Sequence, residues 1–436
     1  MNRFLVSRLA LVLLVVNSVM AFCLAGNQTP GPDLGTCHFS DRVYHDDASL
    51  MARREAPTHF RLMTSRYVSM VQAARGYQCT GTTTVGFNGH HYMQTGSSDD
   101  PGMMELIPTI SRLIGMSIAN TYDVVMLAVI CSGVLIGYCG FWRLYPDRRL
   151  RGIGVAVFLC FGIAEARVAD VYMFQISPLI AGIPWLLHLG LSRKHLALTV
   201  TAALLAFCCS WCSLVRTGSI AICMTFLLTM FAIRYRIQKP LLPLLLVFLA
   251  YVPSALFERS LITRRDTALA KVGETARAVN SHALSHTLYI GLGFIPNSEV
   301  PEYRDGVAAD KVRSIDPSVA YTSAKYQAIL RGELWKLVKR RPMLVIGILA
   351  AKAGIVILLA SILLYPARRL IFAEKSALWL DAAFVLTIAM SAMNGIVAVP
   401  RASYLLTFLC LCFLYTSIKL FTYHARRRLC TRRDDH

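Results

Sequence analysis

Long runs of apolar residues recur along this chain and constrain its fold more than any other feature. The runs are about 17–25 residues long, the length that an α-helix needs to cross the hydrocarbon core of a bilayer. They lie at about residues 4–24, 122–142, 152–166, 170–190, 195–213, 218–234, 239–257, 342–365, 376–399 and 402–422. The sequence therefore predicts an all-α polytopic membrane protein with about ten transmembrane helices.

Two long polar segments interrupt the spans and predict the domain organisation. The first run, residues 1–24, is either a cleaved signal peptide or a retained anchor, and the anchor makes the later topology consistent. The predicted parts that follow are a loop with interfacial helices at 25–121, six spans at 122–257, a second loop at 258–341, three spans at 342–422 and a basic tail at 423–436. Within 103–116 the apolar residues recur at helical spacing, which predicts an amphipathic helix at the membrane surface.

The formal net charge of +20 is explained by the distribution of Lys and Arg between the two sides of the membrane. Short cytoplasmic loops collect these residues, whereas long loops do not count in the rule. With the N-terminus inside, clusters of Arg and Lys occupy residues 143–151, 193–194, 234–239, 368–375 and 426–433, and the short outside turns contain only Arg167, Arg216 and Arg401. This pattern predicts that both termini are cytoplasmic and that both long loops are external. A basic patch of the type that binds nucleic acid is not visible, so we expect no nucleic-acid partner.

The thirteen cysteines have no metal-binding spacing. Cys208, Cys209 and Cys212 lie inside an apolar run, where cysteine usually packs as a small hydrophobe. Cys37 and Cys79 both lie well inside the first external loop, and an oxidising compartment would allow them to form a disulfide. We predict no metal site and no cofactor, and the sequence leaves open whether a divalent metal is needed.

Several cationic residues occupy positions that favour an anionic ligand. Arg167, with Asp170 nearby, Arg216 and Arg401 lie in the short outside turns, where arginine is disfavoured unless it has a role. Three guanidinium groups at one depth could bind a phosphate or diphosphate, and the alternative is that each is an interfacial anchor. Lys352 lies about ten residues into the eighth run, where a charge is either functional or paired with another span.

The two long loops contain the other candidate residues. The second loop contains a cluster of polar residues: His282, His286, Tyr289 and Asn297. This cluster predicts a surface that binds substrate, and the alternative is an ordinary ordered loop. A zinc protease is excluded because Ala283 stands where its motif requires Glu. In the first loop two acidic pairs are candidates for a general base, or are solvated carboxylates without a role; they are Asp46 with Asp47, and Asp99 with Asp100.

This arrangement resembles the GT-C superfamily of membrane glycosyltransferases. The segment Asp100-Pro101-Gly102, followed by an apolar helix that ends at Leu113-Ile114-Gly115, is similar to the proline-containing motif that leads to the second span in that superfamily. The turns at 168–172 and 400–404, and the stretch 282–297, look like segments of bacterial members. The double proline that is usual in this motif is absent from this sequence.

The resemblance implies a polyprenyl-phosphate-linked sugar as donor and a glycan, lipid or protein as acceptor, at the bacterial inner membrane. An external carboxylate, with Asp46 or Asp47 favoured over Asp99 or Asp100, would take the proton of the acceptor hydroxyl, and the outside arginines would stabilise the leaving phosphate. Two other classes remain in view. One is an enzyme of the O-antigen ligase or polymerase type, and the other is a transporter or flippase of lipid-linked glycans that performs no chemistry.

Overall fold

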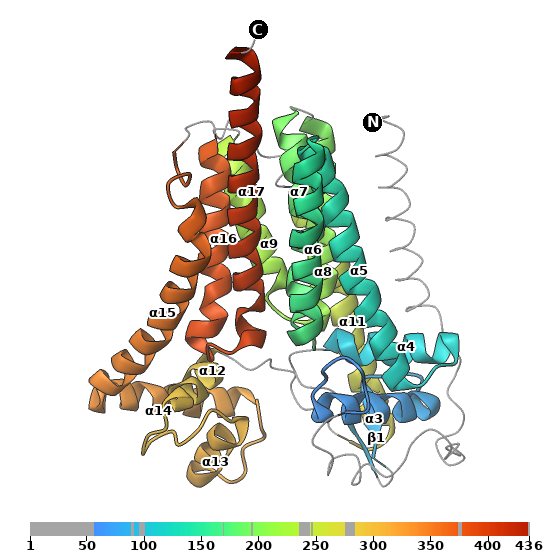
Figure 1. Cartoon of the computed structure of the whole chain (residues 1–436). Coiled ribbons are helices and arrows are strands. Elements are labelled where there is room, and N and C mark those ends of the chain that lie inside the picture. Colours follow the sequence, from blue (N-terminus) through green and yellow to red (C-terminus); the bar gives the residue numbers. More distant parts are fainter. Residues whose placement is uncertain are drawn as a thin grey trace. The chain divides into compact units, whose positions relative to one another are not determined.

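A computed structural model describes residues 56–88, 91–95, 101–168, 170–192, 195–234, 245, 247–274, 284–373 and 377–434. The chain forms two compact units, residues 1–276 and residues 277–436, which are described separately below. In both units helices dominate, and the two strands that the described residues contain form one short hairpin (Figure 1).

Six of the described helices are long and apolar enough to cross a membrane. They are α5 (Ile118–Leu144), α7 (Met173–Leu191), α8 (His195–Val215), the segment Pro342–Ala367 that comprises α15 (Pro342–Leu364) and the turn after it, α16 (Leu378–Val397) and the Ala402–Arg427 part of α17 (Ala402–Asp434). This confirms the expectation of a helical membrane protein. Two further helices, α6 (Arg148–Val168) and α9 (Ser219–Arg234), coincide with predicted spans but carry charges or are shorter.

The membrane helices of the first unit pack closely because small residues line their contacts. Gly133 and Gly137 of α5 face α7, and a methyl group placed on Gly137 would lie 2.4 Å from the carbonyl oxygen of Ile180. Such stripes of small residues let the backbones of membrane helices approach each other. Trp185 of α7 then donates a hydrogen bond of 2.9 Å to the carbonyl oxygen of Ile136.

The polar segments of the first unit form a small folded layer at one end of its helices. Helix α3 (Thr64–Thr80) packs against strand β1 (Val85–Phe87), which pairs antiparallel with β2 (Tyr92–Gln94). Helix α4 (Pro101–Ile114) corresponds to the predicted amphipathic helix. Its Met104 and Ile107 are buried, and Leu113 and Ile114 near its end are exposed. Helix α11 (Val252–Lys271) runs across the predicted end of a span at residue 257, so helical structure extends into the second long loop.

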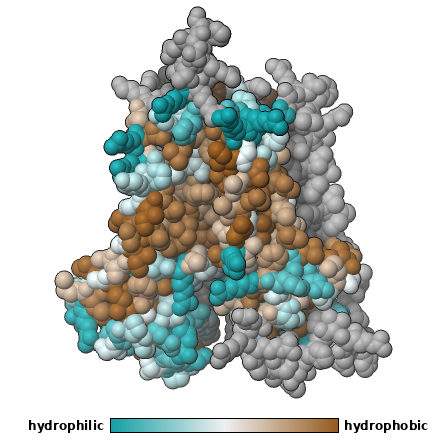
Figure 2. Space-filling view, in the orientation of Figure 1, coloured by the Kyte–Doolittle hydropathy of each residue, from teal (hydrophilic) through white to brown (hydrophobic). Residues whose placement is uncertain are grey.

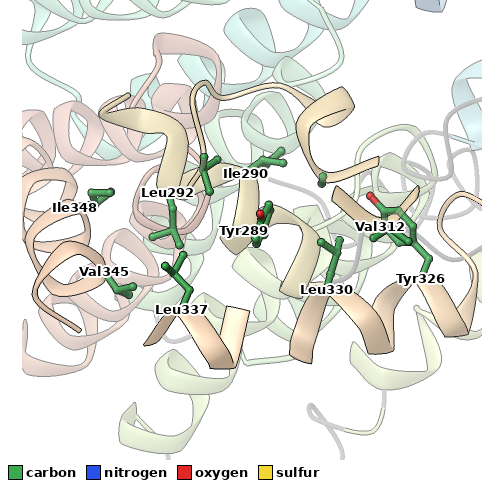
Figure 3. Packing of buried hydrophobic residues seen from close by; sticks show 11 residues of the cluster. Tyr289, Ile290, Leu292, Val312, Tyr326, Leu330, Leu337, Val345 and Ile348 are labelled. Carbon is green, nitrogen blue, oxygen red and sulfur yellow. The ribbon is translucent and has the colours of Figure 1, made fainter. Parts of the chain in front are cut away.

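The described part of the second long loop in the second unit is a packed helical subdomain. It consists of α12 (Leu284–Gly291), the 3₁₀ turn η1 (Leu292–Phe294), α13 (Asp305–Ile315) and α14 (Ala324–Arg340). Figure 3 shows its apolar core, in which Tyr289, Leu330 and Leu337 meet Val345 and Ile348 from the start of α15. The loop is therefore joined to the first span that follows it by a shared core.

The surface of the second unit has the polarity expected of a membrane protein. Figure 2 shows hydrophobic residues over the middle of its long helices and hydrophilic residues toward their ends. In α15 the side chains of Ile357, Leu358 and Ile362 are each at least 60% exposed. An apolar surface of this kind is stable in contact with lipid chains.

Candidate functional site

A buried ion pair joins the first long loop to the turn between α6 and α7. Arg66 of α3 donates from Nη1 to both carboxylate oxygens of Asp170, at 2.9 and 2.7 Å, and both side chains are about nine-tenths buried. Asp170 adopts the left-handed backbone conformation, with φ of 63°, and also accepts the backbone N–H of Val171. The predicted ligand residue Asp170 is therefore fixed in place by an arginine that the sequence patterns did not single out.

Arg216 lies at the end of α8 and stacks on a tyrosine that follows Asp170 by two residues. Its guanidinium carbon is 4.5 Å from the ring centre of Tyr172, and its Nη2 donates to the Tyr172 hydroxyl at 3.3 Å. Gln175 of α7 donates to the carbonyl oxygen of Thr217, which fastens the α8–α9 turn to α7. Arg216 is thus half-buried and contacts a residue two positions after Asp170 in the chain.

Two other charged residues of α6 have different environments. Arg167 is exposed. Glu165 is fully buried, and its Oε1 accepts a hydrogen bond of 2.8 Å from Ser177 of α7. Its Oε2 has no hydrogen-bond partner in the described part of the chain.

A third buried carboxylate of the first unit lies in α4. The side chain of Glu105 is 7% exposed and accepts a hydrogen bond from Thr83, next to the β1 strand. Burial raises the pKa of Glu105 to about 7, and the nearby charge of Arg264 partly opposes this shift. Glu105 was not among the residues predicted for the site, because its partner Thr83 lies 22 residues earlier in the chain.

In the second unit Lys352 serves as a cap for the end of another helix. Its ammonium donates to the carbonyl oxygens of Ala398, at 2.7 Å, and Val397, at 3.5 Å, where α16 ends. Gly291 of α12 lies against the same point, and a methyl group there would be 2.4 Å from the Val397 oxygen and 2.9 Å from the Lys352 nitrogen. The structure gives Lys352 backbone acceptors that the sequence did not indicate, and its role in binding an anionic ligand stays a prediction.

Arg401 occupies the turn between α16 and α17, a few residues from that cap. Its side chain is exposed and lies over the ring of Tyr303 at 5.3 Å. Tyr303 in turn donates a hydrogen bond of 2.8 Å to the hydroxyl of Tyr404 in α17. Arg401 belongs to the second unit, whereas Arg167 and Arg216 belong to the first.

The described residues of the predicted polar cluster in the second loop have contacts within the subdomain, and their role as a substrate surface stays a prediction. His286 is fully buried between Tyr326, whose hydroxyl is 2.9 Å from Nδ1, and Asp305, whose Oδ1 is 3.2 Å from Nε2. Asn297 bonds to backbone groups of its own turn. Tyr289 is buried in the core of the subdomain, and burial raises the pKa of its hydroxyl to about 12.

A buried pair of opposite charges joins α16 and α17. Asp381 is fully buried, and the ammonium of Lys419 lies 2.7 Å from its Oδ1 and 3.0 Å from its Oδ2. The hydroxyl of Tyr415 and the backbone N–H of Phe372 also donate to this carboxylate, each at 2.8 Å. Asp381 and Lys419 are 38 residues apart in the sequence, so only the fold shows that they pair.

Several predicted residues lie outside the described residues. These are the acidic pairs Asp46–Asp47 and Asp99–Asp100, together with His282 and Cys37. Cys79 is buried and disulfide-bonded, and its pairing with Cys37 stays a prediction. Within the described ranges, no group of three His, Cys, Asp or Glu side chains is placed to hold a metal ion.

Comparison with known proteins gave no family model, no curated protein and no solved structure that matches this chain.

Proposed function

We propose that the protein is a multi-pass membrane glycosyltransferase that transfers a sugar from a polyprenyl-phosphate donor to an acceptor hydroxyl on the external face. In this proposal the chain has about ten spans, lies in the bacterial inner membrane and keeps both termini in the cytoplasm. The proposal rests on the chemistry of the Arg216 site and on the resemblance described above.

The observation that carries the proposal is the stacking of Arg216 on Tyr172, two residues after the Asp170 that pairs with Arg66. The site lies where a span end meets the folded layer of α3, β1 and α4. A lipid-linked phosphate would occupy this level of the membrane, with its chain among the apolar helices. A guanidinium group is suited to phosphate because it is always charged and presents parallel N–H donors. Half-burial strengthens such a contact, since fewer water molecules compete with the phosphate.

The proposed reaction also needs a base for the acceptor hydroxyl. A sugar hydroxyl is a poor nucleophile, and a positioned carboxylate typically contributes 10²–10⁴-fold by removing its proton. We assign this role to Asp46 or Asp47 in preference to Asp99 or Asp100, because the early part of the first loop is tethered to the outer end of the first span. Attack of the hydroxyl oxygen at the anomeric carbon then breaks the bond to the lipid phosphate, and Arg216 stabilises the charge that develops on it.

The test is transfer of radiolabelled sugar from polyprenyl-phosphate donors by the full-length protein in proteoliposomes. We expect Arg216→Ala to lower transfer at least tenfold, because a charge-assisted contact with the leaving group is lost. Arg259→Ala is the matched control, since this arginine of α11 is exposed and lies outside the site. Equal transfer by the two variants, measured with equal amounts of folded protein, would exclude Arg216 from donor binding.

One observation favours the ligase or polymerase type as a second candidate. The late loop is a packed subdomain, and its Tyr303 contacts Arg401 at the end of two membrane helices. A late external domain beside an arginine would suit a glycan carried on a lipid diphosphate. The same proteoliposomes supplied with polyprenyl-diphosphate oligosaccharides separate the two candidates. Transfer of a whole glycan favours the second, transfer of a single sugar favours the first, and movement of the lipid across the membrane without transfer indicates a flippase.

A further inference from the structure

Helix α14 presents two different faces along its length. Tyr326, Leu330 and Leu337 point into the core of the subdomain, as Figure 3 shows. The opposite face carries Arg331, Trp335 and Lys339, which follow each other at intervals of four residues and are all exposed. Residues four apart lie on the same side of a helix, so these three form a single line, called here the α14 stripe.

The centre of the α14 stripe is the exposed aromatic ring of Trp335. The side chain of Trp335 is 60% exposed, and the ammonium of Lys339 lies 5.5 Å from its ring centre. Between the charged residues stands Gly332, where nothing lies within 4 Å of the position a side chain would occupy. A large apolar ring exposed in this way on a folded helix indicates a surface that is covered by something else.

The two cations of the α14 stripe also differ from most other cations of this subdomain, which form ion pairs. Lys336 pairs with Glu333, Lys325 with Asp316, and Arg313 lies 3.8 Å from Asp310. Arg331 and Lys339 form no ion pair with any residue in the described ranges. Their charge is therefore available to an anionic partner.

The connection to α15 fixes the depth of the C-terminal end of α14 relative to the bilayer that α15 would span. Helix α14 ends at Arg340, and the apolar span α15 begins two residues later at Pro342. Figure 1 shows α14 running across the direction of α15. At the start of α15, Met343 is 77% exposed and Ile346 is 58% exposed, as expected of side chains in contact with lipid. The C-terminal end of α14 is thus held at the level where the hydrocarbon core begins.

We propose that the α14 stripe binds the phosphate headgroups of anionic lipids in the bilayer that α15 spans. Trp335 lies at the boundary between headgroups and acyl chains, where tryptophan is enriched in membrane proteins. Arg331 and Lys339, one turn to either side, extend their charged ends to the phosphates while their methylene stems cover the apolar surface. The stripe thereby fastens the subdomain to the membrane surface along the length of α14. The inference requires only that α15 spans the membrane, and it is independent of the glycosyltransferase proposal.

The test uses the full-length protein in nanodiscs of phosphatidylcholine that contain a fixed fraction of phosphatidylglycerol. Bromine atoms near the headgroup end of one lipid or the other quench nearby tryptophan emission. The contribution of Trp335 is obtained as the difference between the native protein and Trp335→Phe. We expect brominated phosphatidylglycerol to quench this emission more strongly than brominated phosphatidylcholine at the same mole fraction. Local enrichment of the anionic lipid should be roughly fivefold for each cation of the stripe.

The double variant Arg331→Gln/Lys339→Gln should remove this preference while Trp335 remains accessible to both lipids. Arg313→Gln/Lys325→Gln is the matched control, since it removes the same charge from side chains that are already paired with Asp310 and Asp316. Equal quenching by the two lipids in the native protein would show that the stripe does not select anionic headgroups. Quenching of Trp335 by acrylamide in water, but by neither lipid, would show that the face points to solvent and would overturn the proposal.

Discussion

The pair formed by Asp381 and Lys419 provides the sharpest test of how the second unit is held together. Asp381 is fully buried and Lys419 is 7% exposed, so neither charge is hydrated in the folded state. Lys419 donates to both carboxylate oxygens, while Tyr415 and the backbone N–H of Phe372 supply one further bond each. The carboxylate therefore has all of its hydrogen bonds, but only one cation to balance its charge.

Lys419→Met removes that cation and keeps a side chain of similar length. Removing one partner of a buried ion pair typically costs about 3–5 kcal/mol, because an uncompensated charge is left in a medium of low polarity. The two remaining donors hold the carboxylate in place but do not neutralise it. We therefore expect Lys419→Met to lower the free energy of unfolding by about 3–5 kcal/mol.

A second substitution distinguishes the effect of charge from that of packing. In Lys419→Met/Asp381→Asn the amide oxygen can still accept the N–H of Phe372, and the amide nitrogen can donate to the Tyr415 hydroxyl. The uncompensated charge is gone, so the double variant should regain most of the lost stability. Replacing both members of a buried pair is often close to neutral, whereas breaking it is not.

The assay is unfolding of the purified protein in mixed micelles as the fraction of sodium dodecyl sulfate is raised, followed by circular dichroism. The native protein, both single variants and the double variant complete a double-mutant cycle. The reasoning is refuted if the effects of Lys419→Met and Asp381→Asn simply add in the double variant. Native stability of Lys419→Met would refute it as well.

Three other substitutions test separate parts of the structure. The pKa of Glu105 is raised to about 7, so the cost of burying its ionised form applies above pH 7 and disappears as the pH falls toward 4.5. Because of this carboxyl group, the free energy of unfolding should be up to about 3 kcal/mol higher at pH 4.5 than at pH 8. Glu105→Gln should remove this difference when unfolding by sodium dodecyl sulfate is measured at the two pH values. Gly76→Ala would place a methyl group 1.8 Å from the carbonyl oxygen of Val85, and it should destabilise the protein by about 1–3 kcal/mol in thermal melts, whereas Gly347→Ala, with open space around it, should not. Lys352→Met leaves the buried carbonyl oxygens at the end of α16 without this donor, and it should cost about 1–3 kcal/mol in the same melts.

The positions of the membrane helices followed from the sequence because hydropathy is a local property. The predicted run 195–213 became a helix over His195–Val215, and the run 342–365 became one that begins at Pro342. Helix α11 extends beyond the predicted boundary at residue 257, because its sequence changes from apolar to polar while the helix continues and hydropathy alone does not mark its end. The apolar core of the second loop was also missed, since its residues are scattered over some 60 positions that only the fold brings together.

The candidate site could be predicted only as a set of charged positions. Arg216, and Asp170 near Arg167, stand out because arginine is disfavoured in short outside turns. Their surroundings depend on long-range contacts: Arg66 is 104 residues from Asp170, and Tyr172 is 44 residues from Arg216. For the same reason Lys352 was recognised as unusual, while its acceptors, 45 and 46 residues later, were not.

The contacts of Lys352 and Asp381 also bear on the order in which the chain enters the membrane. Each of these residues is synthesised before the group that satisfies it: the acceptors of Lys352 follow 45 and 46 residues later, and Lys419 follows Asp381 by 38 residues. At ribosomal rates of about 5–20 residues per second, α15 waits roughly 2–9 s with an unsatisfied ammonium. A charge in lipid is costly, so we expect α15, α16 and α17 to leave the insertion machinery as a group rather than one at a time. Alkaline extraction of stalled nascent chains would test this, because a chain that ends at residue 376 should be extracted from the membrane more readily than one that ends at residue 434.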